Sequence, residues 1–98
     1  PRGTAKINCS HSIETYDRIF WYKKSNLELQ LLGNMYANNP NVEKGSGVTI
    51  EGDANKNKTC TLIIDSLSVN SSGVYFCAAR DRGDDPAIFG SGTRVTVL

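Results

Sequence analysis

The segment from Ser71 to Thr93 constrains the fold of this 98-residue chain more than any other. It contains Val74-Tyr75-Phe76-Cys77, a β-branched and aromatic run that is typical of a half-buried strand. The residues that follow, from 78 to 88, are polar and include glycine and proline, which indicates an irregular hairpin tip. Phe89-Gly90-Ser91-Gly92 then restarts a strand with a bulge, because glycine tolerates the backbone angles that a bulge needs. An ordered frame that presents a charged loop is typical of recognition rather than of chemistry.

Four residues with a defined spacing extend this frame to the start of the chain. Cys9 precedes Trp21 by 12 positions and Cys77 by 68, and Tyr75 stands two residues before Cys77. This set resembles the immunoglobulin fold. The resemblance implies an all-β, two-sheet sandwich, with a Cys9–Cys77 disulfide between strands B and F over a buried Trp21. It also implies that Tyr75 is the tyrosine-corner residue, whose hydroxyl bonds nearby backbone.

The Phe-Gly-x-Gly element narrows the resemblance to the variable type, because it is similar to a joining segment. Residues 89–98, FGSGTRVTVL, resemble joining segments of T-cell receptor β chains. Residues 57–79, NKTCTLIIDSLSVNSSGVYFCAA, resemble β-chain variable regions of bony fish. The resemblance covers essentially the whole chain. It implies one immunoglobulin-like variable domain over residues 1–98, with the joining segment at about 88–98.

Composition fits one small secreted domain. Ninety-eight residues are enough for one two-layer core, and a formal net charge of +1 gives no basic face for nucleic acid. No apolar run approaches the roughly 18 residues that a membrane helix needs, and residues 1–98 are expected to contain no signal peptide. Three cysteines suggest one disulfide and one leftover thiol, Cys60, and a structural disulfide implies the secretory route. The resemblance places the chain in the extracellular part of a plasma-membrane receptor.

Alternating apolar residues predict the strands and the core. Ala5, Ile7 and Cys9 face inward on strand B, and Cys60, Leu62 and Ile64 face inward on strand E. Only eight residues precede Cys9. The family pattern has about one more strand there, so strand A is expected to be missing and the sheet edge to be open to aggregation. Strand E is expected at 59–64, and further strands are expected at 19–24, 29–32 and 48–50. Hypervariable loops are expected at 10–18, 33–41, 51–58 and 78–88.

Two departures from the family pattern concern charged or polar partners. Ser71 stands where the pattern has Asp, and Ser46-Gly47-Val48 lacks the Arg that would pair with it. Both partners of one ion pair are therefore missing together, which avoids a buried unpaired charge. Lys24 stands where Gln is usual on the face that meets a partner domain, which weakens the expectation of a Gln–Gln contact.

Catalytic, metal and cofactor sites are not expected. The single histidine, His11, lies in a polar loop with no nucleophile motif beside it, and it is expected to be solvated. No C-x-x-C or H-x-x-x-H spacing occurs, and the adjacent carboxylates of Asp84 and Asp85 are expected to be solvated rather than to bind a cation. Cys60 is expected to be a buried, unreactive thiol.

The resemblance implies two functional surfaces. The loops would contact a peptide held by a major histocompatibility complex (MHC) molecule. The outward face of the strands at 19–24, 29–32 and 74–77, together with Phe89, would pair with an α-chain variable domain. The implied antigen-binding residues are Glu14, Tyr16, Asp17, Tyr36, Asn38, Arg80, Asp81, Arg82, Gly83, Asp84 and Asp85. The implied domain-pairing residues are Tyr22, Lys24, Leu29, Leu31, Phe76 and Phe89. The third loop offers few rigidifying contacts, so ordering costs are expected to keep the affinity for ligand modest.

Three Asn-x-Ser/Thr sequons occur, at Asn8, Asn57 and Asn70. Asn57 and Asn70 fall in expected exposed loops and are candidate glycosylation sites, whereas Asn8 adjoins Cys9 and is the poorest.

Two other readings of the function remain open. An immunoglobulin light-chain variable domain would pair with a heavy chain, and its joining segment also ends in Thr-Val-Leu. An adhesion or inhibitory receptor domain would carry a germline-fixed loop between Cys77 and Phe89. An enzyme is the remote third alternative.

Overall fold

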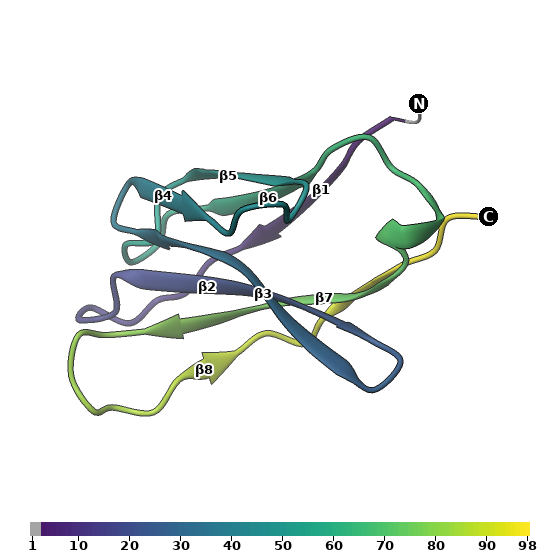
Figure 1. Ribbon diagram of the computed structural model, residues 1–98. Coiled ribbons are helices and arrows are strands. Elements are labelled where there is room, and N and C mark those ends of the chain that lie inside the picture. The colour runs from purple at the N-terminus through teal and green to yellow at the C-terminus, as the bar shows by residue number, and fades with distance from the viewer. Residues whose placement is uncertain (1–2) are drawn as a thin grey trace.

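The structure, a computed structural model that describes residues 3–98, is a sandwich of two antiparallel sheets (Figure 1). This architecture confirms the predicted V-type fold. The smaller sheet has the order β1-β6-β5, and the larger has the order β4-β3-β2-β7-β8, with β9 also paired to β7. The strands of the smaller sheet are β1 (Ala5–Cys9), β5 (Val48–Gly52) and β6 (Cys60–Ile64). Those of the larger are β2 (Arg18–Ser25), β3 (Glu28–Tyr36), β4 (Asn39–Val42), β7 (Gly73–Arg80), β8 (Ile88–Phe89) and β9 (Thr93–Val95).

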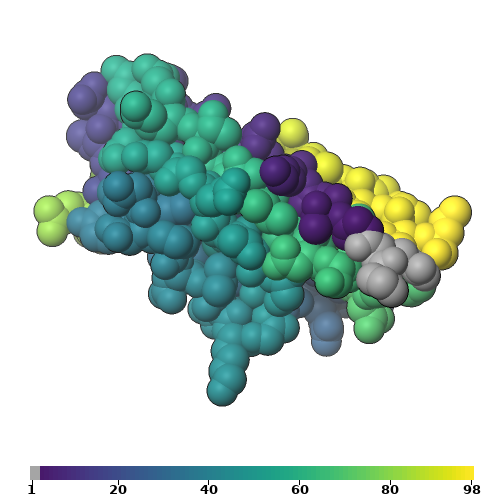
Figure 2. Space-filling model, turned by 90° about the horizontal axis from the view of Figure 1, so that it is seen from above, coloured from purple at the N-terminus to yellow at the C-terminus, as the bar shows by residue number. Residues whose placement is uncertain are grey.

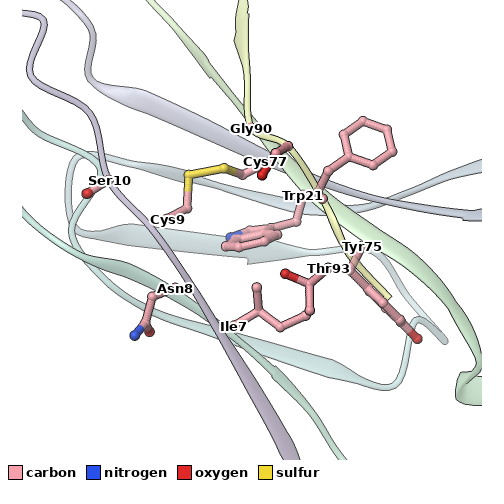
Figure 3. A pocket seen from close by; sticks show the side chains of 12 residues that line it. Ile7, Asn8, Cys9, Ser10, Trp21, Tyr75, Cys77, Gly90 and Thr93 are labelled. Carbon is pink, nitrogen blue, oxygen red and sulfur yellow. A yellow bond between two sulfur atoms is a disulfide. The ribbon is translucent and has the colours of Figure 1, made fainter. Parts of the chain in front are cut away.

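A disulfide and a tryptophan connect the two sheets. Cys9 on β1 is bonded to Cys77 on β7, as the resemblance implied. Trp21 is almost completely buried between the sheets, and its Nε1–H points at the Cys60 sulfur at 3.4 Å. The indole lies beside the disulfide and above Ile7 in Figure 3. The core cluster also contains Leu62 and Tyr75.

The alternation predicted for strands B and E is confirmed. On β6, Cys60, Leu62 and Ile64 are buried, and they pair in register with Cys9, Ile7 and Ala5 of β1. Because successive side chains of a strand point to opposite faces, this register brings the apolar residues of both strands to the same core.

The turn before β7 confirms the tyrosine corner. A single 3-10 turn, η1 (Val69–Ser71), precedes this strand, and the Tyr75 hydroxyl donates to the carbonyl oxygen of Ser71 at 2.6 Å. The ring of Tyr75 is buried, and burial raises the pKa of its hydroxyl. The bond therefore satisfies a polar group that would otherwise be costly in the core.

The prediction of an irregular second loop at 33–41 is wrong for most of that range. β3 continues to Tyr36 and β4 begins at Asn39, so only two residues connect them. Gly33, with φ of +156°, permits β3 and β4 to approach closely because it has no Cβ atom. A Cβ atom there would lie only 2.6 Å from the carbonyl oxygen of Asn41. Pro40 is tolerated because β4 is the edge strand of its sheet. Glycine and proline here mark close strand approach and a sheet edge rather than a loop.

The prediction of an irregular segment over residues 78–88 is also too long. β7 runs to Arg80 and β8 begins at Ile88, so the loop is confined to residues 81–87. Ala78 and Ala79 are buried, and Ala79 pairs with Ile19 of β2. Pairing with the central strand β2 extends β7 beyond the end of its β-branched and aromatic run.

β1 lies at the edge of the smaller sheet, and it is the first strand within residues 3–98. In Figure 2 the purple N-terminal segment runs alongside the yellow C-terminal segment. A groove of about 230 Å³ between them is lined by Ile7 and Ser10 on one side and by Gly90 and Thr93 on the other (Figure 3). Within residues 3–98, β1 pairs only with β6, so its outer backbone edge is open, in line with the predicted tendency to aggregate.

A second hollow, of about 320 Å³, occupies the corner where the family pattern has an ion pair. Ser71, Ser46 and Gly47 all line it. The ammonium of Lys23 on β2 reaches across this corner and donates to the carbonyl oxygen of Asn70. Loss of both charged partners therefore leaves space that is bordered by hydroxyl groups, without an isolated buried charge.

The buried thiol of Cys60 gives the first testable prediction. Burial raises the pKa of this thiol, so the reactive thiolate is disfavoured in the folded domain. We expect iodoacetamide at pH 8 to label the native protein on the order of 100-fold more slowly than the protein unfolded in guanidinium without reductant, because access requires opening of the core. Intact-mass analysis would show one adduct per unfolded chain. Rapid labelling of the native protein would contradict the burial of Cys60.

Candidate recognition site

Four connections gather at one end of the sandwich, on the left of Figure 1, whereas both labelled ends of the chain lie on the right. They join β1 to β2, β3 to β4, β5 to β6 and β7 to β8, and they span residues 10–17, 37–38, 53–59 and 81–87. In the following, the last of these is called the third loop. Three of these connections close antiparallel hairpins, so each joins adjacent strand ends. The first connection instead passes from β1 in the smaller sheet to β2 in the larger.

Backbone hydrogen bonds tie three of these connections into one block. The Ala37 amide donates to the carbonyl oxygen of Asp17 at 2.8 Å, and the Ala54 amide donates to the carbonyl oxygen of Ala37 at 2.8 Å. Ala54 is completely buried. The first loop, the β3–β4 turn and the tip at 53–59 are thus held together by main-chain groups.

His11 closes this block, so the prediction of a solvated loop histidine is wrong. Its Nε2 lies 2.7 Å from the carbonyl oxygen of Ala54, and its Nδ1 accepts a bond of 3.1 Å from the Ile13 amide. The Asn57 amide donates to the carbonyl oxygen of His11 at 2.8 Å. This arrangement requires the tautomer with hydrogen on Nε2. His11 therefore connects the first loop to the β5–β6 tip, and its partners in that tip, Ala54 and Asn57, lie too far along the sequence to be predicted.

Tyr16, implied to contact antigen, is instead part of the core. Only 6% of the residue is exposed, and its hydroxyl donates to the carbonyl oxygen of Pro86 at 2.6 Å. Burial, followed by the nearby carboxylates of Asp85 and Asp81, raises the pKa of this hydroxyl. The implied role is corrected accordingly: the buried ring is not available to a ligand and supports the third loop from below.

Arg18 is a further residue at this end that the sequence analysis missed. Its guanidinium carbon lies 4.5 Å from the centroid of the Tyr36 ring, a cation–π distance, and its NH1 donates to the carbonyl oxygen of Asp81 at 3.3 Å. Its Nε lies 4.0 Å from a carboxylate oxygen of Asp17. Arg18 thereby contacts the end of the first loop, the end of β3 and the start of the third loop.

The third loop exposes most of its charged side chains. Arg80 at the end of β7, and then Arg82, Asp84 and Asp85, are exposed. Within the loop, the Gly83 amide donates to an Asp81 carboxylate oxygen at 2.9 Å. The hydrogen bond that protonated Asp85 donates to the Asp81 carboxylate, together with the negative charge of Asp81, raises the pKa of Asp85. Glu14 and Asn38 are also exposed at this end, whereas Asp17 is only partly exposed.

A second candidate surface lies on the outer face of the larger sheet. Tyr22 and Phe76 pair in register and stack with ring centroids 5.5 Å apart, and Phe89 lies 6.1 Å from Phe76. Leu29 is 62% exposed and Leu31 38% exposed. These five implied pairing residues thus all lie on the outward side of one sheet, with the exposed Lys24 beside them. Exposed apolar residues gathered on one sheet face are typical of an interaction surface.

Other kinds of site find little support in the geometry. Within residues 3–98, no group of three or more His, Cys, Asp or Glu side chains is arranged to hold a metal ion. Across the same residues, no helix has the length and apolar character needed to cross a membrane.

Comparison with known proteins assigns the chain to a family. The sequence profile of the immunoglobulin V-set domain matches residues 2–98. The chain is an immunoglobulin V-set domain. It is 34% identical over 93 residues to the mouse protein "T-cell receptor beta chain V region PHDS203", covering 94% of this chain and 74% of that protein. It is 30% identical over 102 residues to the mouse "T-cell receptor beta chain V region C5", covering 98% of this chain and 80% of that protein.

Solved structures agree with this assignment. A chain from a chicken T-cell receptor structure superposes with a TM-score of 0.77 at 31% identity, covering 97% of this V-set domain and 43% of that chain. A structure from work on T-cell specificity and activation by the bacterial superantigen toxic shock syndrome toxin-1 superposes with a TM-score of 0.81 at 27% identity, covering 98% and 86%. These relatives support a T-cell receptor variable domain, which is an extracellular receptor domain of a family not known for enzymatic activity.

The role of His11 gives the second prediction. Replacement by alanine leaves the buried Ala54 carbonyl and the Ile13 amide without their partners. We expect His11→Ala to lower the free energy of unfolding by about 1–2 kcal/mol, as is usual when hydrogen-bond partners are removed. Urea unfolding followed by tryptophan fluorescence measures this change.

Glu14→Gln in the same loop is the matched control. Glu14 and Lys56 form an exposed ion pair at 3.0 Å, and such pairs contribute little, so we expect a change within about 0.5 kcal/mol. Equal free energies of unfolding for His11→Ala and the control would contradict the role of His11 in connecting the first loop to the β5–β6 tip.

Proposed function

We propose that this V-set domain is the antigen-recognition domain of a T-cell receptor β chain at the cell surface. It pairs with an α-chain variable domain through the outer face of the larger sheet, and its loops contact a peptide held by an MHC molecule. The proposal rests on the placement of a partly exposed aromatic face and a block of joined loops on one V-set domain whose relatives are β-chain variable regions.

The pairing face has the composition of an interface centre. The Tyr22–Phe76–Phe89 series supplies large rigid rings, which carry much of the binding energy in protein interfaces. Leu29 and Leu31 extend the same face with exposed aliphatic surface. Lys24 at this face replaces a neutral amide by a charge, so we propose that the partner domain meets it with an acceptor group.

The loops supply the antigen surface. Arg80, Arg82, Asp84 and Asp85 are exposed and combine both signs of charge, which allows discrimination by attraction and by repulsion. The exposed Glu14, Asn38 and Tyr36 lie at the same end of the domain. The Asp81 carboxylate accepts a bond from the Gly83 amide within the third loop, and the Asp17 carbonyl oxygen accepts one from the Ala37 amide. We propose that the third loop faces the peptide, because it projects at the same end as the other connections (Figure 1).

Two alternatives make different predictions about the partner. A light-chain variable domain would pair with a heavy-chain variable domain through the same face. An adhesion or inhibitory receptor domain would show no variation between Cys77 and Phe89 among transcripts of one animal. A bony-fish origin stays a prediction, since the relatives named above come from mouse and chicken.

The third prediction tests the pairing face. Co-refolding with a matched α-chain variable domain should give a one-to-one heterodimer by gel filtration and light scattering. Because Phe89 is 60% exposed, Phe89→Ser removes an interface anchor without opening the core. We expect this variant to weaken association at least about tenfold, as for a typical hot spot.

Val69→Ser is the control for this experiment. Val69 is 63% exposed, but it lies on η1, away from the outer face of the larger sheet. It should pair as the parent domain does. The proposed interface would be refuted if the parent domain did not pair with the α-type partner. It would also be refuted if the Phe89→Ser variant paired as tightly as the parent domain. Pairing with a heavy-chain domain instead would favour the light-chain alternative.

The fourth prediction concerns glycosylation. Asn57 and Asn70 are exposed in turns, and we propose that both carry N-linked glycans in an animal secretory host. Asn8 is expected to remain free, because its side-chain oxygen accepts a bond of 2.9 Å from the Thr61 hydroxyl on the paired strand. Intact mass before and after peptide-N-glycosidase treatment, with Asn57→Gln and Asn70→Gln as matched variants, measures occupancy. Unmodified protein would refute this proposal.

A further inference from the structure

We propose that Tyr16 and Arg18 are positioning residues that hold the two ends of the third loop, so that only its tip, residues 82–85, adapts to a ligand. This inference rests on the recognition role proposed above and names the residues that control it. It also revises the expectation that the loop has few rigidifying contacts.

Tyr16 holds the C-terminal end of the loop. Its ring belongs to the buried core cluster, and its hydroxyl bonds the Pro86 carbonyl oxygen at 2.6 Å. A tyrosine has only two rotatable side-chain bonds, and here both are fixed by packing. The hydroxyl is therefore a donor of fixed position at the base of the loop. Proline restricts the backbone at the acceptor, which makes this end of the loop stiff on both sides of the bond.

Arg18 holds the N-terminal end. It lies opposite Tyr36 on β3 and opposite Arg80 on β7, so the pairing of β2 with both neighbours places it directly below the loop. The guanidinium carbon lies over the Tyr36 ring, 4.5 Å from its centroid, and NH1 donates to the Asp81 carbonyl oxygen at 3.3 Å. A stacked guanidinium loses less rotamer freedom per hydrogen bond than a free side chain does.

The tip between these anchors is not held in this way. Among residues 3–98, no hydrogen bond joins Arg82, Asp84 or Asp85 to a segment outside the loop. The only amide held by a side chain in the tip is that of Gly83, and its acceptor is Asp81 within the same loop. The loop therefore consists of two fixed ends and a short exposed tip.

The chemistry of the two anchors suits a loop of variable sequence. Both acceptors are main-chain carbonyl oxygens, which every residue has, and both donors lie outside the loop. The same anchors can hold loops that differ in their side chains. Binding then has to order the tip alone, which lowers the entropic cost of recognition.

Backbone ¹⁵N relaxation of the free domain tests this inference. In the parent domain we expect order parameters near 0.85 for Asp81 and Ala87, as for a strand, and lower values at Gly83–Asp85. Tyr16→Phe keeps the ring and removes the hydroxyl, so it should lower the value at Ala87 below about 0.6 and leave Asp81 unchanged. Arg18→Gln should lower the order parameter of Asp81 and leave that of Ala87 unchanged. Tyr36→Leu should lower the order parameter of Asp81 by a smaller amount.

Glu14→Gln, in the first loop but without contact to the third, should leave all of these values unchanged. The order parameters of β2 and β7 should also stay constant in every variant, which separates positioning of the loop from a general loss of structure. A third loop that is mobile throughout in the parent domain would overturn the inference, as would unchanged values in the Tyr16→Phe, Arg18→Gln double variant. The measurement needs neither a partner domain nor an antigen, so its outcome is independent of whether the pairing proposal holds.

Discussion

The disulfide between Cys9 and Cys77 is the constraint on which the rest of the structure depends. It joins the edge strand of the small sheet to a strand near the middle of the large one, and it closes a loop of 68 residues. On the chain-entropy account, such a link is worth about 4 kcal/mol, a large share of the stability of a small domain. Trp21 fills the space beside it (Figure 3), so the covalent bond and the packing act at the same place.

Much of the fold could be predicted because its signals are local or depend on a defined spacing. Alternation with period two predicts the inward side chains of β1 and β6, and the resemblance carried by the Cys, Trp and Tyr-x-Cys residues implies the sandwich. The same rules failed at residues 33–41. There glycine and proline favour a loop by composition, whereas in the structure Gly33 permits close approach of β4 and Pro40 occupies a sheet edge. Composition alone does not separate these cases.

The support beneath the recognition site could not be predicted, for a related physical reason. The contacts of His11, Tyr16 and Arg18 join residues that are 43, 70 and 63 positions apart. No local pattern encodes such pairs, since they depend on how the two sheets bring the connections together. A polar residue in a predicted loop was therefore expected to face solvent or ligand, although each of these three side chains is partly or fully buried and bonded to main chain.

The short β3–β4 turn has a consequence for the shape of the recognition surface. Two residues, Ala37 and Asn38, form the whole connection, and Ala37 is engaged by its backbone in the bonds to Asp17 and Ala54. A turn of this size offers a small area to any ligand. If the loops bind a ligand as proposed, most contact area has to come from the third loop and from the first loop with its neighbouring tip at 53–59, and the ligand would sit off-centre towards those segments.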